Sequence, residues 1–227
     1  MLESAFIAMS LDSALFTREW FRFAFPHLLE THKDLTVVFG NRLFMYNKTV
    51  VGDEGKELRI DLPLARAREG KRATEIHVFL EGEVARLPPG LRERVTLARW
   101  EDFTDTVFQD IYRVLSIAYA GLQSFRDCVD LDVETHLMGR GSGLLPQNVH
   151  RRLSALYVVE ETALLIRIAE NGRPFDFYPQ NQIHTLEAVY TGDFANAGLS
   201  VEGLVGHPQR RIFTPLPLPQ GVLAKGD

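Results

Sequence analysis

Cysteine is nearly absent from this chain of 227 residues, because Cys128 is the only one. A single cysteine forms no internal disulfide, which excludes the disulfide-stapled class of small secreted domains. Long apolar runs are also missing: the longest candidates, around 156–168, are interrupted by Glu160, Glu161 and Arg167 and fall short of the roughly 18 residues of a membrane span. The start of the chain lacks the basic and apolar segments of a signal peptide. We therefore expect a cytoplasmic protein with no membrane partner.

An excess of positive charge is missing as well. Lysine and arginine number 25 against 30 acidic residues, so the formal net charge is -5 and the pI is about 5.8. Such a chain has no global field that attracts polyanions, and contact with nucleic acid requires a local basic patch. The seven histidines show neither an HExxH pattern nor paired Cys/His spacing, so no metal site is expected.

Apolar residues are present in sufficient number for one sizeable core. They make up 45% of the chain, and we expect a single domain over residues 1–227. Short apolar runs typical of buried parallel strands alternate with helical patterns, which indicates an α/β fold with a doubly wound, mainly parallel sheet. The predicted strands are 5–9, 35–39, 75–80, 94–98 and 174–178, and the predicted helices are 14–31, 103–137 and 147–170.

Proline and glycine modify this pattern. Pro26 lies inside the first predicted helix, where it is expected to cause a kink. Residues 43–74 resemble a hairpin that turns around 53–55, an antiparallel excursion in place of a crossover helix. The segment 207–227 contains four prolines, which exclude a central strand or helix, so we expect an extended tail on the surface.

Two polar residues end the first and the last predicted strands. In an open parallel sheet the binding crevice lies beyond the carboxyl ends of the strands, so Ser10 and Tyr178 are candidates for one site at that rim. Residue types alone favour an ordinary role for each. Ser10, with Asp12 and Ser13, would cap or turn into a helix, and Tyr178 would be a half-buried tyrosine that closes the core.

The last predicted helix supplies a third element. Tyr157 and Glu161 are four residues apart and share one helical face. Apolar neighbours place Glu161 in a partly dry environment, where a carboxylate needs a cation or hydrogen-bond donors. Tyr157 and a bound ammonium group would meet that need, and pairing with Arg126 or Arg113 is an alternative of equal weight. Glu160 is expected to face solvent.

Two groups of basic residues are candidates for contact with a polyanion. Near the start of the last predicted helix, positive charge is disfavoured by the helix dipole, and an anionic partner would remove that penalty. The second group has little apolar pattern around it. A solvated surface is the alternative for both. The groups are Arg151 and Arg152 with His150, and Arg66, Arg68, Lys71 and Arg72.

Taken together and in this order, three motifs resemble those of the tRNA-dependent cyclodipeptide synthases. They are FIAMS ending at Ser10, YVVEE from Tyr157 to Glu161, and FYP ending at Tyr178-Pro179. The resemblance implies that the first carries the nucleophilic serine, the second a Tyr-x-x-x-Glu pair and the third a tyrosine at the rim of the sheet. Ser13 and the Tyr178-Pro179 pair are similar to the X-Y-P branch of the family.

The resemblance also implies a Rossmann-like fold similar to the catalytic domain of class I tyrosyl- and tryptophanyl-tRNA synthetases, without ATP-binding signatures. Neither a HIGH-like nor a KMSKS-like motif occurs in the chain. We expect a monomer without cofactors that takes aminoacyl-tRNA as its partner. The region 43–94 departs from the family, since it is short and partly strand-like where the family has a long basic helix. Its local basic residues are Arg66, Arg68, Lys71, Arg72, Arg92 and Arg94.

The implied activity is that of an aminoacyltransferase that makes cyclodipeptides (2,5-diketopiperazines) through an aminoacyl ester on Ser10. Tyr157 and Glu161 would hold the α-ammonium group, and Tyr178 would relay a proton during ring closure. Substrate-binding roles are implied for Ser13 and Pro179. Two other interpretations stay open: a non-catalytic relative that binds aminoacyl-tRNA or a small acyl ligand, and a Rossmann-like enzyme acting on a nucleotide or another ester.

Overall fold

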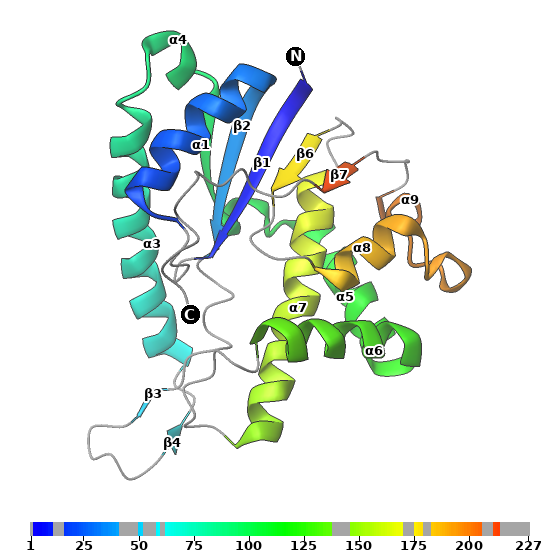
Figure 1. Cartoon of the computed structure of the whole chain (residues 1–227). Coiled ribbons are helices and arrows are strands. Elements are labelled where there is room, and N and C mark those ends of the chain that lie inside the picture. Colours follow the sequence, from blue (N-terminus) through cyan, green and yellow to red (C-terminus); the bar gives the residue numbers. More distant parts are fainter. Residues whose placement is uncertain are drawn as a thin grey trace.

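The structure is a computed structural model, which describes residues 2–10, 16–40, 50–51, 58–59, 62–137, 146–169, 175–178, 183–205 and 211–213. Within these residues a five-stranded sheet has the order β5-β2-β1-β6-β7, and every neighbouring pair is parallel (Figure 1). The predicted doubly wound α/β sheet is confirmed. Its strands are β1 (Leu2–Ser10), β2 (His32–Gly40), β5 (Val95–Arg99), β6 (Phe175–Tyr178) and β7 (Arg211–Phe213).

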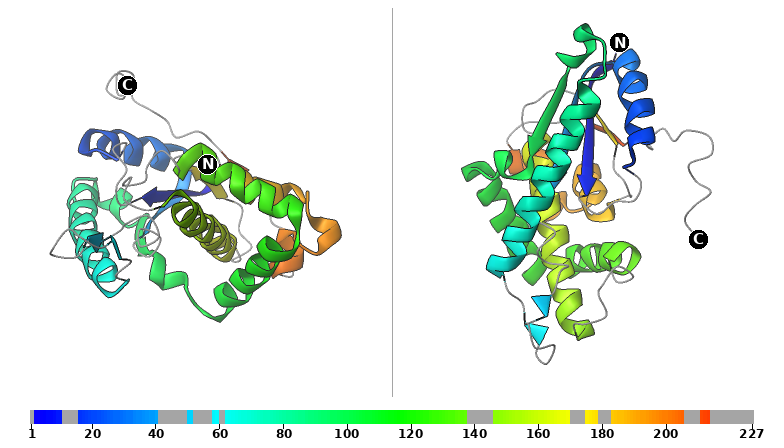
Figure 2. Two further views of the ribbon diagram at one scale, coloured as in Figure 1. Left: turned by 90° about the horizontal axis from the view of Figure 1, so that it is seen from below. Right: turned by 90° about the vertical axis from the view of Figure 1, so that its left-hand side faces the viewer.

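Helices cover both faces of the sheet (Figure 2). Ala5, Ile7 and Met9 of β1 pack with α1 and α3, whereas Phe6 and Ala8 pack with α5 and α7. Because successive strand residues point to opposite faces, β1 supplies both halves of the core. The helices are α1 (Arg18–Thr31), α3 (Leu62–Val84), α4 (Pro89–Arg92), α5 (Thr106–Gly121), α6 (Gln123–Asp132), α7 (Gln147–Ala169), α8 (His184–Thr191) and α9 (Val201–Val205), with 3-10 turns η1 (Trp100–Phe103) and η4 (Ala195–Ala197) and a π-helix η2 (Val133–Leu137).

A helix replaces one predicted strand. The strand expected at 75–80 is wrong, because these residues lie inside α3. The run EIHVFL has strand-like residue types, yet its burial follows helical spacing: Ala73, Ile76 and Leu80 are buried, while Val78 is exposed between them. Packing of this stripe against the sheet overrides the local β propensity.

The hairpin predicted for 43–74 is confirmed in part. β3 (Val50–Val51) pairs antiparallel with β4 (Leu58–Arg59). From residue 62 onward the prediction is wrong, because α3 forms the crossover between β2 and β5 that the hairpin was expected to replace. The expectation that the region 43–94 is too short for the long basic helix of the family is also wrong, because α3 has 23 residues.

Other boundaries follow local capping. The helix predicted at 103–137 is divided at Leu122, which is extended with φ -108 and ψ 107 and separates α5 from α6. The helix predicted at 14–31 begins at residue 18, where the Thr17 hydroxyl accepts a hydrogen bond from the backbone N–H of Trp20 at 3.2 Å. Pro26 lies inside it as expected. The third predicted helix matches α7 to within one residue.

Part of the proline-rich tail is a strand. β7 pairs with β6 at the edge of the sheet, which agrees with the exclusion of a central position. The rest of the predicted tail, 207–227, lies outside the described residues, and the single domain stays a prediction. Among the helices that the structure describes, none combines the length and the apolarity needed to cross a membrane.

Candidate active site at the carboxyl edge of the sheet

The sheet reverses its direction of growth between β1 and β6. From β1 the chain adds β2 and β5 on one side, and β6 and β7 follow on the other. In open parallel sheets a topological switch point of this kind is where ligands bind, at the carboxyl ends of the two central strands. Ser10 is the last residue of β1 and Tyr178 is the last of β6. The backbone therefore brings both predicted residues to the expected edge of the sheet.

The strand register gives the positions of Ser10 and Tyr178 relative to each other along the strand direction. Tyr178 pairs with Ile7, while Ser10 pairs with Gly40 of β2. Ser10 thus lies three residues beyond Tyr178 along the strand direction, or about 10 Å at the usual rise per residue. Ser13 and Pro179 lie outside the described residues, so their predicted roles stay predictions.

Helix α7 carries the Tyr-x-x-x-Glu pair and extends past the carboxyl edge of the sheet (Figure 1). The Tyr157 hydroxyl donates to Glu161 Oε1 at 3.4 Å, and both side chains are half-buried. The alternative arginines have other partners: Arg126 donates to the carbonyl oxygen of Tyr119 at 3.0 Å, and Arg113 pairs with an aspartate on its own helix. The predicted pairing of Tyr157 with Glu161 across one helical turn is confirmed.

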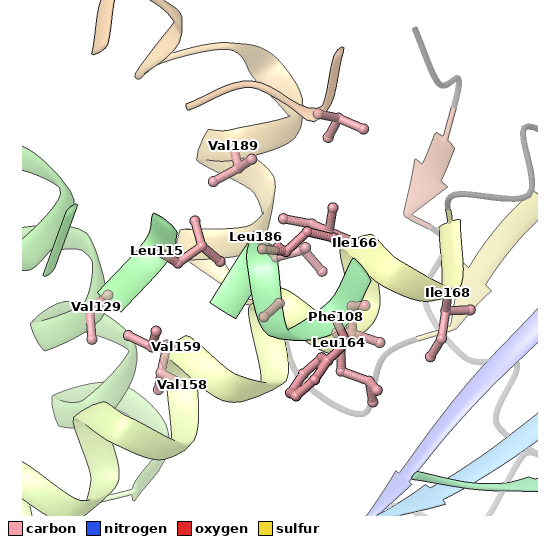
Figure 3. Close-up of a cluster of buried hydrophobic side chains, with 14 of the residues drawn as sticks. Phe108, Leu115, Val129, Val158, Val159, Leu164, Ile166, Ile168, Leu186 and Val189 are labelled. Atoms are coloured by element: carbon pink, nitrogen blue, oxygen red, sulfur yellow. The ribbon is translucent and has the colours of Figure 1, made fainter. Parts of the chain in front are cut away.

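Glu160 corrects a prediction. It was expected to face solvent, but it is 1% exposed, and it makes an interaction in that buried position. The reason is that α7 has no continuous solvated face in its second half, since α5, α6 and α8 surround it (Figure 3). In a helix with so little solvated surface, a residue one position away from a core-facing residue need not point to water.

The basic candidates divide between two ends of the sheet. The first turns of α3 project beyond the carboxyl edge (Figures 1 and 2), so α3 brings the group at 66–72 to the end where Ser10 lies, and Lys71 and Arg72 there are exposed. Arg152 is exposed in α7, whereas Arg151 forms an ion pair with Glu134 of η2, and His150 is buried.

Arg92 and Arg94 lie at the opposite end of the sheet, Arg92 as the last residue of α4 and Arg94 just before β5. The guanidinium of Arg94 donates to the carbonyl oxygens of Leu29, His32 and Lys33, and Arg92 donates to the carbonyl of Leu87 at 2.7 Å. Both side chains hold backbone turns at the amino edge of the sheet. These contacts give no support to their predicted role in binding tRNA.

An ion pair fixes the end of α7. Arg167 near its C-terminus makes two hydrogen bonds of 2.9 Å from Nε to the carboxylate of Asp105, which also caps α5 by accepting from the backbone N–H of Phe108 at 3.0 Å. The hydrogen bond from Arg167 lowers the pKa of Asp105 to about 2. The helix that carries Tyr157 and Glu161 is thus tied to its neighbour at one point.

This pair predicts a pH dependence of stability. Because the folded-state pKa of Asp105 lies below its unfolded value of about 3.9, the stabilisation is present above about pH 4 and is lost as the pH falls through about 2. The Asp105→Asn variant keeps the cap but lacks this titration, so its free energy of unfolding should fall less steeply than that of the wild type between pH 4 and pH 2. Urea unfolding at fixed pH values measures both, and parallel curves would contradict the expectation.

The side chains were searched for a possible metal site. Within the described residues, no three His, Cys, Asp or Glu side chains are arranged to hold a metal ion. The sequence analysis missed one buried carboxylate altogether. Asp132 at the end of α6 is buried and binds the start of α8, six residues after Tyr178. Its neighbours in sequence carry no signal for this, because the contact joins residues more than fifty positions apart.

Comparisons with known proteins fall into two kinds. No protein-family model matches the sequence, and no curated protein matches it. The fold, however, is similar to solved structures of cyclodipeptide synthases. One from Fluoribacter dumoffii has a TM-score of 0.71 at 14% identity, covering 92% of this chain and 88% of that chain. One from Candidatus Glomeribacter gigasporarum, bound to Phe-tRNAPhe, has a TM-score of 0.66 at 13% identity, covering 100% of this chain and 93% of that chain.

A third similar structure links the fold to a larger group. It is a Mycobacterium tuberculosis protein whose structure demonstrates that cyclodipeptide synthetases are related to type I tRNA synthetases. Its TM-score is 0.61 at 16% identity, with 83% of this chain and 78% of that chain covered. The chain therefore has the Rossmann-like fold of the cyclodipeptide synthases over most of its length, as the three motifs led us to expect.

Proposed function

We propose that the chain is an aminoacyltransferase that makes cyclodipeptides from two aminoacyl-tRNAs. The observation that supports this proposal is that Ser10 and Tyr178 end two neighbouring strands at the switch point of a fold similar to that of cyclodipeptide synthases, with the Tyr157–Glu161 pair on the helix that passes the same edge. A shared fold alone hosts many activities, so the proposal depends on these four residues.

The first step is acyl transfer to the enzyme. Ser10 Oγ attacks the ester carbonyl of the first aminoacyl-tRNA, the bond to the ribose oxygen breaks, and tRNA leaves with the proton on its terminal hydroxyl. The amino acid is already activated by its ester to tRNA, so this step consumes no ATP. Glu161 binds the α-ammonium group with the Tyr157 hydroxyl beside it, which places the carbonyl carbon against Ser10.

Two further acyl transfers complete the product. The free amine of the Ser10-bound aminoacyl group attacks the ester of a second aminoacyl-tRNA, giving a dipeptidyl-enzyme and a second free tRNA. The terminal amine of that dipeptide then attacks the Ser10 ester, closes the six-membered ring and releases the serine hydroxyl. Tyr178 relays a proton in this closure, because a phenol of pKa near 10 is a weak base but a good donor and acceptor.

The binding of tRNA is assigned to the basic N-terminal half of α3, where Lys71 and Arg72 are exposed. Arg66, Arg68, Lys71 and Arg72 lie on helical turns that project past the carboxyl edge, on the side of the molecule where an acceptor end would have to reach Ser10. Arg152 of α7 is at the same end. Cytoplasmic location, a monomeric state and membership of the X-Y-P branch remain predictions that agree with this function.

The salt dependence of binding tests the basic end of α3. Each phosphate contact contributes roughly 0.7–0.9 to the slope of log affinity against log salt concentration. The combined Lys71→Ala and Arg72→Ala variant should therefore bind aminoacyl-tRNA more weakly and lower this slope by up to about 2. Lys33→Ala is the control, since Lys33 is exposed at the amino edge of the sheet. A slope unchanged in the double variant would argue against this docking surface.

The function itself is tested with the wild-type protein and charged tRNAs. A mixture of aminoacyl-tRNAs is incubated with the enzyme, and cyclic dipeptides are sought by mass spectrometry while the loss of charged tRNA is followed. We expect cyclic dipeptides and discharged tRNA in proportion, two tRNAs for each product molecule. Binding of charged tRNA without any discharge would instead favour the non-catalytic relative.

A further inference from the structure

Arg99 is the last residue of β5 and lies at the carboxyl edge of the sheet. It pairs in the strand register with Phe39 of β2, which in turn pairs with Met9 of β1, the residue before Ser10. Two strand spacings of about 4.8 Å separate β5 from β1, so the backbone of Arg99 lies about 10 Å from that of Ser10. Arg99 is thus at the same edge of the sheet as the proposed nucleophile.

The pleat of β5 decides to which face of the sheet the Arg99 side chain points. Ala98 belongs to the buried cluster formed with α5 and α7, whereas Leu97 packs against the cluster formed with α1 and α3. Because successive side chains of a strand alternate, Arg99 shares the face of Leu97. Phe39 is buried on this face beside it, and the ring centroids of Phe39 and of His77 on α3 are 5.6 Å apart. The side chain of Arg99 therefore lies on the side of the sheet that α3 covers.

The guanidinium of Arg99 has neither an ion pair nor a hydrogen bond among the residues that the structure describes. Asp102 is close in sequence, but its carboxylate accepts from the backbone N–H of Arg99 at 2.8 Å. A partly desolvated cation is costly without an anion or acceptors beside it, so this position favours an anionic ligand. The other partly buried arginines with described side chains each donate to a carbonyl oxygen or pair with a carboxylate; they are Arg94, Arg126, Arg151 and Arg167.

The basic turns of α3 continue outward from this position. His77, which packs against Phe39, marks the part of α3 that lies over the end of β2. The exposed Lys71 and Arg72 are six and five residues nearer the start of the helix, or about 8–9 Å further out at 1.5 Å per residue. The first turns of α3 project past the carboxyl edge (Figure 1). A polyanion that follows α3 toward the sheet therefore meets Arg99 at its inner end.

The proposed substrate limits the choice of anion. Esterification to the ribose removes the charge of the amino acid's α-carboxylate, so the negative charges common to all aminoacyl-tRNAs are the backbone phosphates. Arginine suits such a group, because its planar fork donates two parallel hydrogen bonds to phosphate oxygens. The side-chain carboxylate of an aspartyl or glutamyl group is the alternative. The Tyr157–Glu161 pair, which is proposed to hold the amino acid, lies on α7 at the other face of the sheet, and this favours the phosphate.

We propose that Arg99 binds a backbone phosphate at the single-stranded 3′ end of the aminoacyl-tRNA, close to the ester that Ser10 attacks. The inference rests on the proposed function for the identity of the ligand. Arg99 takes no part in bond making, and its contact fixes the last nucleotides so that the ester carbonyl reaches Ser10. This role differs from docking on the outer turns of α3, because it concerns one phosphate near the nucleophile.

A binding experiment with uncharged RNA tests this contact without any acyl transfer. An RNA minihelix that ends like tRNA carries, at one of its last three linkages, a neutral methylphosphonate in place of the phosphate. Its affinity is measured for the wild type, for Arg99→Gln and for the control Arg113→Gln. Arg113 is exposed on α5, at the other face of the sheet, where it pairs with Asp110. Arg99→Gln keeps the backbone N–H that binds Asp102.

We expect Arg99→Gln to bind the unmodified minihelix about tenfold more weakly than the wild type, with a salt slope smaller by about 0.7. At one linkage the methylphosphonate should weaken the wild type and Arg113→Gln by a similar factor and have no further effect on Arg99→Gln, because that phosphate has already lost its partner. Equal losses at every linkage in all three proteins overturn the proposal, and so does a wild type that does not bind the minihelix. If Arg99→Gln does not fold, Arg99→Met keeps the apolar stem of the side chain and is judged by the same criterion.

Acyl transfer gives a second readout, which separates a phosphate from a side-chain carboxylate. Single-turnover acylation of Ser10 is measured at limiting concentrations of neutral and of acidic aminoacyl-tRNAs. Arg99→Gln should slow acylation by both kinds about tenfold, and Arg113→Gln should slow neither. A loss confined to aspartyl- and glutamyl-tRNA overturns the proposal in favour of the carboxylate. If the wild type binds the minihelix but is acylated by none of these substrates, the proposed function fails while the binding experiment still decides the role of Arg99.

Discussion

Ser10→Ala is expected to abolish the aminoacyl-enzyme and to reduce cyclodipeptide formation by about a thousandfold or more, which is the scale seen when a nucleophile is removed. The reason is that alanine leaves no atom to carry the acyl group, while the binding of aminoacyl-tRNA is retained. Intact-mass measurement after mixing with charged tRNA should show the added aminoacyl mass on the wild type and none on the variant. Mass spectrometry of the supernatant measures the cyclic product.

The matched control is Ser4→Ala. Ser4 lies on the same strand as Ser10, in the half of β1 that is far from the carboxyl edge, and the substitution removes the same hydroxyl. It should leave both the acylated mass and the product yield unchanged. Cyclodipeptide formed at an undiminished rate by Ser10→Ala would exclude the covalent route through this serine, whatever the fold suggests.

Glu161→Gln is expected to slow formation of the aminoacyl-enzyme by about 10- to 100-fold, because a charge-assisted hydrogen bond to the ammonium group contributes about 1.5–3 kcal/mol. Glutamine has the size of glutamate and keeps an acceptor for the Tyr157 hydroxyl, which donates to Glu161 at 3.4 Å in the wild type. The decrease in rate therefore reports the loss of the negative charge alone. Single-turnover acylation at saturating charged tRNA measures this rate. Tyr157→Phe should give a smaller loss, since the hydroxyl supports the carboxylate without replacing it.

Two comparisons make this result specific. Glu202→Gln removes the same charge from an exposed position on α9 and should have no effect on acylation. A substrate in which the α-amino group is acetylated has no ammonium charge, so it should acylate the wild type and Glu161→Gln equally slowly. If Glu161→Gln acylates Ser10 as fast as the wild type does, Glu161 does not hold the ammonium group.

The local sequence pattern predicted those features correctly that depend on contacts within a single strand or helix. β1, β2, β5 and β6 coincide with apolar runs bounded by polar or helical segments, and α7 ends within one residue of the predicted position. The pairing of Tyr157 with Glu161 also follows from spacing alone, since residues four apart on a helix are neighbours. These features depend on a few consecutive residues, so they are visible without knowledge of the fold.

Local pattern failed where burial was decided by distant elements. The stretch 75–80 has the residue types of a strand, but the face of α3 that carries Ile76 and Leu80 packs against the sheet. Glu160 is buried because α7 is enclosed by three other helices, a circumstance that no window of sequence reveals. In the sequence Asp132 resembles any acidic residue at the end of a helix, and only the packing of α8 against α6 shows that it caps α8.

What the sequence by itself determined was the alternation of strands and helices, the ends of β1 and β6 at Ser10 and Tyr178, and the helical pair on α7. Only the tertiary structure decided that β1 and β6 are neighbouring strands, that α3 carries its basic turns to the carboxyl edge of the sheet, and that Asp132 of α6 caps the start of α8. The physical reason is range: propensity, capping and side-chain periodicity act over a few residues, whereas strand order and burial arise from the packing of segments far apart along the chain.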